Sequence, residues 1–195
     1  MPPTLILAST SRYRAALLDR LRIPFTTVAP GVDESPLPGE LPRSRAARLA
    51  AAKAAAVAAR HPGSWVVGSD QVADLAGRVL GKPGDAAACR AQLAAESGQV
   101  VEFHTAVTLL RSDPGAAYRH VDRTAVRFRI LTAAEIARYV EIDRPYDCAG
   151  GFRSEGLGAF LFESLETADP AALVGLPLIW LAGALRAAGL DPLAN

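Results

Sequence analysis

The chain has few cysteines and histidines, and each shortage excludes a class of protein. Only 2 cysteines and 3 histidines occur in 195 residues. Cys89 and Cys148 are too few for the disulfide framework of a small secreted domain, and they indicate a reducing compartment. The histidines His61, His104 and His120 are scattered along the chain without metal-ligand spacing, which argues against a zinc site.

Long apolar runs and an excess of charge are also missing. The first apolar run, Leu5 to Ala8, has no basic leader, so we expect no signal peptide. The C-terminal apolar stretch from Leu176 to Leu185 is too short to span a bilayer. The net charge of +1, from 21 basic and 20 acidic side chains, argues against a general binder of nucleic acids or membrane surfaces. We therefore expect a soluble, cytoplasmic protein with no nucleic-acid or membrane partner, whose positive field is local to a pocket.

Three common motifs of nucleotide and hydrolase chemistry are missing as well. The sequence contains no Walker phosphate loop and no GxGxxG dinucleotide motif. It also has no GxSxG elbow, which argues against serine hydrolase chemistry. Any phosphate site must therefore be built in another way.

The pattern that is present predicts an α/β fold, because short apolar runs alternate with helical patterns along the whole chain. At 195 residues, the chain is long enough for one well-buried domain or two small lobes. Strands are predicted at 5–8, 25–29, 65–67 and 159–165, and a hairpin of longer strands at 100–110 and 118–130. Helices are predicted at 11–22, 44–60, 85–96 and 132–142, one starting at Asp169, and one from Pro177 that is apolar nearly all round and is expected in the core.

Residues 4–18 place a short strand against a helix whose first turn carries arginines. A helix N-terminus carries roughly half a positive charge and unpaired N–H groups, so Arg12 and Arg14 add to an existing excess. A bound phosphate relieves that excess, and Ser9 and Ser11 add hydroxyl groups to such a site. The alternative is a surface helix with two solvated arginines, and this segment alone leaves both open.

Three other charged residues have a position that favours chemistry. Asp70 follows the apolar run 65–67, so we expect its carboxylate where a buried strand ends, unless it is an ordinary turn aspartate. Lys53 lies on the apolar face of its helix, where a lysine either snorkels to the edge or points into a cleft. Lys82 precedes Pro83, which holds it extended from a turn; the alternative is a plain exposed lysine.

Asp33 and Glu34 are adjacent carboxylates in a proline-rich loop. They are either solubilising charges or oxygen ligands of the kind that Mg²⁺ prefers. The cations, the carboxylate of Asp70 and such a ligand are together the parts needed to hydrolyse a phosphoanhydride.

A set of short segments carries a resemblance to a known family. The segments ASTSRYRAALL, PGVDES, KAAAV, GSDQV, GKP, YDCAGGFRSEGLG and DPAALVGLPL occur in the order seen in the Maf family of nucleotide pyrophosphatases. The match runs from Leu5 to about Gly189. GSDQV and YDCAGGFRSEGLG are similar to its 7-methyl-GTP pyrophosphatase branch, whereas the dTTP/UTP branch tends to show ADTVV.

The resemblance implies a fold, a reaction and a cofactor. The implied fold is α/β, an elongated mixed sheet flanked by helices, with two lobes and a nucleotide cleft between them, in a single domain over residues 1–195. The implied reaction cleaves a nucleoside triphosphate at the α-phosphate, giving the monophosphate and diphosphate, with a divalent cation such as Mg²⁺ or Mn²⁺. Two alternatives remain: a dTTP/UTP pyrophosphatase, or a weakly hydrolysing nucleotide-binding regulator of cell division. A homodimer is also left open.

The resemblance also implies roles for individual residues. A 7-methylguanine ring is cationic, so an aromatic face and a carboxylate suit it. By motif, Asp70 would activate water with Lys53 and Lys82 beside it; Ser9, Ser11 and Arg14 would bind the phosphates; Glu34 and Asp70 would hold the metal; and Tyr13, Gln71 and Glu155 would select the base. Glu155 would accept hydrogen bonds from the guanine edge, the alternative being an ordinary loop glutamate.

The first helix departs from the family pattern SPRR or SPWRR at three positions. Arg12 stands at the proline position, Ala15 at the second arginine position, and Tyr13 where the branch usually has tryptophan. Either one phosphate contact is missing, or Arg12 replaces it from the preceding turn. Tyr13 also offers a smaller surface for stacking.

Overall fold

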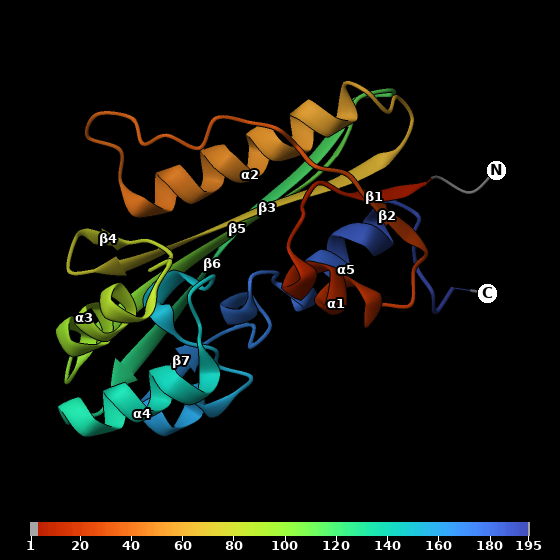
Figure 1. The fold of residues 1–195 in the computed structure, drawn as a ribbon. Helices are drawn as coiled ribbons and strands as arrows, with labels where there is room; N and C mark the ends of the chain where they lie inside the picture. The colour runs from red at the N-terminus through yellow and green to blue at the C-terminus, as the bar shows by residue number, and fades with distance from the viewer. Residues whose placement is uncertain (1–3, 195) are drawn as a thin grey trace.

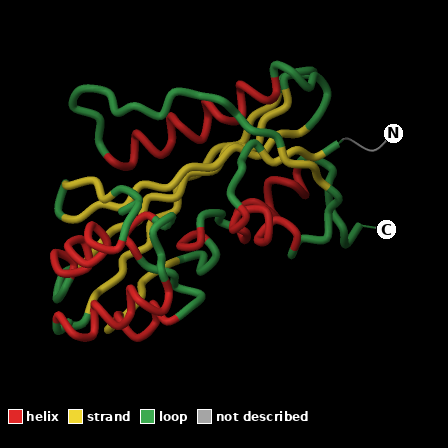
Figure 2. Tube along the Cα trace, viewed as in Figure 1, coloured by secondary structure: helices red, strands yellow, loops and turns green. Residues whose placement is uncertain are grey.

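The computed structural model describes residues 4–194. A mixed sheet of seven strands runs through an elongated molecule in the order β2-β1-β3-β5-β6-β7, with β4 paired to β3 (Figures 1 and 2). Among the strands of residues 4–194, β1 alone makes parallel pairs, with β2 and β3; the other pairs are antiparallel. The predicted α/β class is confirmed. The strands are β1 Leu5–Leu7, β2 Phe25–Thr27, β3 Trp65–Leu75, β4 Arg78–Leu80, β5 Val100–Arg111, β6 Ala116–Phe128 and β7 Phe162–Thr167.

The helices divide the molecule into two lobes along this one sheet. Helix α2 (Pro42–Ala58) covers one face, while α1 (Arg12–Asp19) and α5 (Leu178–Ala187) pack below the other face at one end (Figure 1). Helices α3 (Ala86–Glu96) and α4 (Ala133–Asp143) lie at the opposite end. Each end has its own apolar core, one around Trp65 and one around Phe103. Within residues 4–194, no helix is both long and apolar enough to traverse a lipid bilayer.

Several elements that were predicted from short sequence patterns are confirmed. Thr132 and Glu135 form a capping box at the start of α4, and Asp85 caps α3. The two long strands pair as a hairpin, from Val100 opposite Arg127 to Arg111 opposite Ala116. These features depend on residues close in sequence, which is why the pattern predicted them.

The prediction that the strand at Trp65 ends near Val67 is wrong. Strand β3 runs on to Leu75, so Asp70 lies in the middle of a strand. What ends at this point is the neighbouring strand: Leu7, the last residue of β1, pairs with Val67. Beyond it β3 keeps its antiparallel partner β5 on the other side, and this pairing holds the polar segment extended. The open edge that β1 leaves becomes one wall of the site.

Of two further C-terminal predictions, the strand is confirmed with shifted bounds and the helix is wrong. The strand predicted at 159–165 begins only at Phe162, after a 3₁₀ turn at Leu157–Leu161, η2. The helix predicted at Asp169 is a short 3₁₀ turn, η3 (Ala172–Val174), and the Asp169 carboxylate instead accepts a hydrogen bond of 2.6 Å from the Ile179 amide at the start of α5.

Helix α5 is only half in the core, contrary to the prediction from its apolar sequence. Leu181 and Leu185 are buried, whereas Ile179 is 67% exposed. The helix lies at the end of the molecule, where the sheet covers a single face of it (Figure 1).

Candidate functional site

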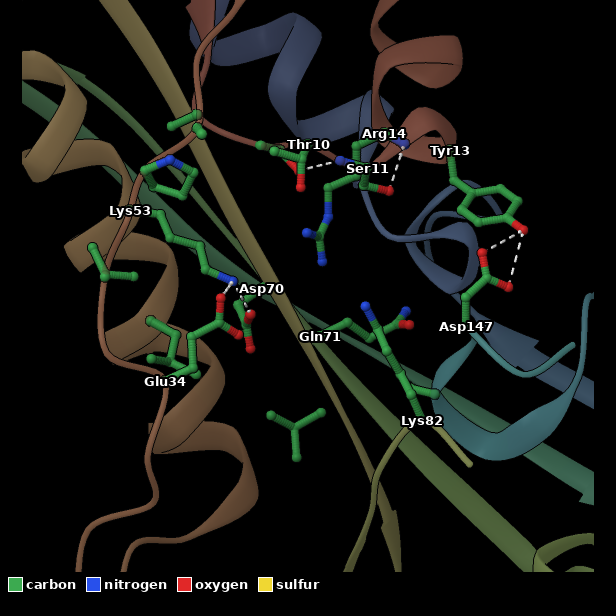
Figure 3. Close-up of a pocket in the computed structure, with 18 of the residues that line it drawn as sticks. Thr10, Ser11, Tyr13, Arg14, Glu34, Lys53, Asp70, Gln71, Lys82 and Asp147 are labelled. Carbon is green, nitrogen blue, oxygen red and sulfur yellow. Dashed lines mark hydrogen bonds and ion pairs between the residues drawn. The ribbon is translucent and has the colours of Figure 1, made fainter. Parts of the chain in front are cut away.

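A cavity of about 750 Å³ opens where β1 ends and one edge of β3 is left free. Its size is in the range of small-molecule sites. The segment before α1, the loop after β2, one face of α2 and the middle of β3 all contribute side chains, which converge on one space in Figure 3. The cavity therefore collects residues that are far apart in the sequence.

Three charged side chains form what we call the deep end of the cavity: Glu34, Lys53 and Asp70. The Lys53 ammonium lies 2.7 Å from Asp70 Oδ1 and 2.8 Å from Glu34 Oε1. Lys53 is 5% exposed and Asp70 6% exposed. Lys53 therefore points into the cavity and does not snorkel. Loss of Lys53 would leave the buried Asp70 charge without its ion-pair partner, which is strongly destabilising, whereas after loss of Asp70 the lysine would keep Glu34.

Gly68 makes this pairing possible. A Cβ at Gly68 would overlap the carbonyl oxygen of Ala50 and lie 2.6 Å from the Ala54 amide nitrogen. The absence of a side chain lets α2 approach β3 closely, and this brings Lys53 on the helix to Asp70 on the strand. The sequence pattern did not single out Gly68, although an isolated glycine in an apolar run is a known sign of close backbone approach.

The start of α1 brings the predicted phosphate-binding residues to the opposite wall. Ser11 caps the helix by accepting from the Arg14 amide, and Ser9 Oγ accepts from the Ser11 amide at 3.1 Å. The first turn of α1 contains no acidic residue. The Arg14 guanidinium points into the cavity (Figure 3), and its Nε donates to the Gly175 carbonyl at 3.0 Å. Burial lowers the pKa of Arg14 from its usual value and Asp70 and Glu34 partly oppose this, so the group stays charged.

The loop that carries Glu34 is fastened to α2. Arg45 donates to the Glu34 carbonyl and Arg48 to the Ser35 carbonyl, each at 3.0 Å. Arg48 also pairs with Glu40 and lowers the pKa of that carboxyl to about 2. Asp33, the second carboxylate of this loop, accepts from the Ser35 amide within its own turn and does not line the cavity. Of the two adjacent carboxylates, only Glu34 reaches the site.

A second, smaller cavity of about 120 Å³ adjoins the first, and Tyr13, Gln71 and Glu155 all line it. Gln71 donates from its amide nitrogen to Thr105 Oγ1 and to the carbonyls of Ala172 and Leu173. Its carbonyl oxygen is therefore the free end. The Glu155 carboxylate accepts from Ser154 Oγ at 3.2 Å. The structure thus brings the three predicted base-selecting residues together, and two of them, Gln71 and Glu155, offer acceptor atoms there.

Lys82 lies on the loop after β4 and lines both cavities. Its side chain enters from the side opposite Lys53 in Figure 3. No salt bridge found within residues 4–194 involves it. It is an exposed lysine that faces the cavity, so both sequence readings hold in part.

The Arg12 guanidinium is held by side chains at the rim of the cavity, and both readings of its role toward phosphate stay predictions. Its guanidinium donates to the Tyr13 hydroxyl at 2.8 Å and lies 3.6 Å from Asp147 Oδ2, at the rim of the cavity. Asp147 and its partner Arg153 are also residues that the sequence analysis missed. Apart from the segment YDCAGGFRSEGLG, which contains both, nothing in the sequence pattern points to them. We call Tyr13, Asp147 and Glu155 the mouth of the site.

Comparison with known proteins decides the family. The sequence pattern of the family described as Maf-like protein matches residues 4–188. The chain belongs to the Maf family. Its similarity to curated relatives covers nearly its whole length. A 7-methyl-GTP pyrophosphatase of Xanthomonas oryzae pv. oryzae is 57% identical over 189 residues, which cover 97% of this chain and 98% of the relative. The protein of the same name from Bordetella avium is 52% identical over 194 residues, covering 99% and 97%.

The deep end also offers a donor set for a divalent cation. Within the described residues, no group of three histidine, cysteine or carboxylate side chains forms a self-contained metal site. Glu34 and Asp70 each use one oxygen for Lys53, which leaves a second carboxylate oxygen for other contacts. Mg²⁺ is commonly held by one or two carboxylates together with substrate phosphates, so this Maf protein's residues fit such an ion.

Proposed function

We propose that this Maf protein is a nucleoside triphosphate pyrophosphatase that hydrolyses 7-methyl-GTP or a related modified nucleotide to the monophosphate and diphosphate. The observation that carries the proposal is the buried Lys53–Asp70 pair, which faces Arg14 across one cavity. The names of the relatives from Xanthomonas and Bordetella support the choice of substrate.

The chemistry follows from the deep end. Asp70, with one oxygen held by Lys53, accepts a proton from water through its other oxygen. The water oxygen bonds to the α-phosphorus while the bond to the bridging oxygen breaks, and the diphosphate leaves with the electron pair. Arg14, Lys82 and the hydroxyls of Ser9 and Ser11 stabilise the charge on the phosphate oxygens. A divalent cation, Mg²⁺ or Mn²⁺, held by Glu34 and by a lone pair of Asp70 that the proton transfer does not use, would supply further charge neutralisation.

Base selection follows from the smaller cavity. Tyr13 offers a cationic purine the ring face that the Arg12 guanidinium does not cover. The carbonyl oxygen of Gln71 and the carboxylate of Glu155 accept hydrogen bonds, which suits the N–H donors on the guanine edge. A thymine or uracil edge offers a single ring N–H donor between two carbonyl acceptors and matches this arrangement less well. The geometry therefore favours 7-methyl-GTP over the dTTP/UTP alternative.

The test is a screen for diphosphate release from 7-methyl-GTP, GTP, dTTP and UTP with Mg²⁺ or Mn²⁺. We expect the highest kcat/KM with 7-methyl-GTP. A preference for dTTP would overturn the roles given to Tyr13 and Glu155. Tight nucleotide binding without turnover at any metal concentration would instead favour the regulator of cell division.

Two other expectations belong to this proposal. The single catalytic unit predicted for residues 1–195 is supported by one continuous sheet that joins both lobes; residues 1–3 and 195 lie outside the described part. A cytoplasmic location is supported by the free thiols of Cys89 and Cys148.

A further inference from the structure

A contact between the two lobes crosses the mouth of the site. The hydroxyl of Tyr13, at the start of α1, donates to the two carboxylate oxygens of Asp147 at 3.3 and 3.4 Å. The two residues are 134 positions apart in the sequence. Figure 3 shows the phenol and the carboxylate facing each other at the edge of the cavity. We call this contact the Tyr13–Asp147 bridge.

The carboxylate end of the bridge is anchored in its own lobe. Arg153 donates to Asp147 Oδ1 at 3.3 Å and to the carbonyls of Asp143 and Arg144 at 2.9 and 3.3 Å. These carbonyls lie at the C-terminal end of α4, where backbone acceptors lack helical partners. Partial burial is the largest single influence on the pKa of Asp147 and acts to raise it, but the hydrogen bonds from Arg153 and Cys148, a backbone hydrogen bond and the charge of Arg153 together outweigh burial. The pKa is therefore below its usual value, and Asp147 is ionised at neutral pH. The bridge therefore presents a fixed, charged acceptor to Tyr13.

The other end of the bridge uses two of the positions that depart from the family pattern. Arg12 donates to the Tyr13 oxygen at 2.8 Å, and its guanidinium carbon lies 4.9 Å from the centre of the Tyr13 ring. The phenolic oxygen thus accepts a hydrogen bond from Arg12, and the single phenolic proton is donated to Asp147. A phenol bonded on both sides has less freedom to turn than an unbonded ring.

The bridge bears more on the site than on the stability of the fold. The side chains of Arg12 and Asp147 are 71% and 51% exposed, and exposed ion pairs contribute little to stability. Tyr13 and Asp147 nevertheless line both cavities, so the bridge borders the space where the base would lie. Fixing the ring before the nucleotide arrives reduces the ordering cost of binding.

We propose that Asp147 is a positioning residue, which holds the Tyr13 ring across the mouth through the phenolic hydroxyl and so prepares the stacking surface for the base. This rests on the proposed function, because the base in question is that of the nucleotide substrate. Asp147 itself touches no reacting atom. Its effect is expected in KM and not in kcat.

The experiment compares Asp147→Ala, Asp147→Asn, Tyr13→Phe and the double variant Tyr13→Phe/Asp147→Ala. We expect Asp147→Ala and Tyr13→Phe each to raise KM for 7-methyl-GTP about fivefold, the size that loss of one hydrogen bond produces. The value of kcat should stay within about twofold of the wild type, and the double variant should be no worse than Tyr13→Phe. Asp147→Asn keeps an acceptor oxygen and should restore most of the affinity. Glu141→Ala, an exposed carboxylate on α4, is the matched control.

Hydrogen exchange of the protein without nucleotide provides a readout that does not depend on activity. Loss of the bridge should speed amide exchange in residues 144–156 in both Asp147→Ala and Tyr13→Phe, but not in Glu141→Ala. Tyr13→Phe leaves Asp147 and Arg153 intact, so it tests the bridge even where Asp147→Ala fails to fold. Unchanged KM and unchanged exchange in Tyr13→Phe, or fully additive effects in the double variant, would overturn the proposal. A wild-type protein that does not hydrolyse 7-methyl-GTP would defeat the proposed function instead, and exchange would still report on the bridge.

Discussion

The deep end of the site and its mouth are built in different ways. Lys53 and Asp70 stand on a helix and a strand whose backbones are fixed by regular hydrogen bonding, and their charged atoms meet at 2.7 Å. Tyr13 and Asp147 stand at a helix start and on a loop, are partly exposed, and meet at 3.3 Å or more. The Lys53–Asp70 pair of the deep end is therefore buried, although Glu34 beside it is 54% exposed, whereas the side chains at the mouth are partly exposed and meet at longer distances.

This difference separates two tasks. Chemistry needs groups held closely in an environment from which water is partly excluded, and regular elements provide that precision. Selection among bases needs side chains that differ between related proteins, and loops and helix ends accept such changes at little cost to the fold. We therefore expect changes at the deep end to affect all nucleotides equally, and changes at the mouth to affect the choice between them.

The largest effect is expected for Asp70→Asn. The amide cannot accept the proton of the attacking water, so kcat should fall by a factor of about 10² to 10⁴ while nucleotide binding is retained. Steady-state kinetics of diphosphate release measure it. The control is Asp33→Asn, because the Asp33 carboxylate serves only its own turn. An unchanged kcat in Asp70→Asn would remove Asp70 from its role.

Gly68→Ala tests whether close packing of α2 on β3 brings the deep end together. The added Cβ would collide with the backbone of Ala50 and Ala54, so the free energy of unfolding should fall by roughly 1–3 kcal/mol. Chemical denaturation measures the loss. Gly183→Ala in α5 meets no atom within 4 Å and should leave stability equal or slightly higher. Equal stabilities of Gly68→Ala and the wild type would contradict the packing argument.

Glu155→Gln tests whether the mouth of the site selects the base. Replacing a charged acceptor by a neutral amide should lower kcat/KM for 7-methyl-GTP about tenfold, with a smaller effect on dTTP. A competition assay with both nucleotides measures the ratio. If the ratio stays at its wild-type value, Glu155 is an ordinary loop glutamate.

The smallest effect is expected for a change at Glu96. This carboxyl group is buried like that of Asp70, but it has no ion-pair partner among the described residues, whereas Asp70 is paired with Lys53. Burial raises the pKa of Glu96 well above its ordinary value of 4.5, with Gln92 and Arg78 opposing only in part. Above pH 4.5 the unfolded chain releases the Glu96 proton, whereas the folded protein keeps it up to a higher pH. The free energy of unfolding therefore falls as the pH rises above 4.5. Thermal unfolding at pH 5 and pH 8 should show a smaller drop for Glu96→Gln than for the wild type. A parallel drop in both proteins would exclude this contribution.

Much of the fold could be predicted from the sequence because its signals are local. The capping box at Thr132 and Glu135 is formed by residues three positions apart, and the hairpin turn between β5 and β6 is formed by the few residues that join the two strands. The position of Asp70 could not be predicted in the same way. Its strand continues through a polar segment because β5 holds it from one side, and a single-sequence pattern does not reveal that partner.

In the candidate site, too, some features could be predicted from the sequence and others depend on how distant segments meet. The types of residue at Arg14, Lys53 and Asp70 predicted a phosphate site, and the structure brings them to one cavity. The Tyr13–Asp147 bridge joins residues 134 positions apart, so its existence depends on how the two lobes meet. The catalytic, phosphate-binding and base-selecting roles given to these residues stay predictions.

The most direct test of the division between deep end and mouth is the ratio of kcat/KM for 7-methyl-GTP to that for dTTP, measured in Asp70→Asn and Glu155→Gln beside the wild type. We predict that Asp70→Asn lowers both values by the same factor and leaves the ratio unchanged, whereas Glu155→Gln lowers the ratio. A changed ratio in Asp70→Asn, together with an unchanged ratio in Glu155→Gln, would contradict the account.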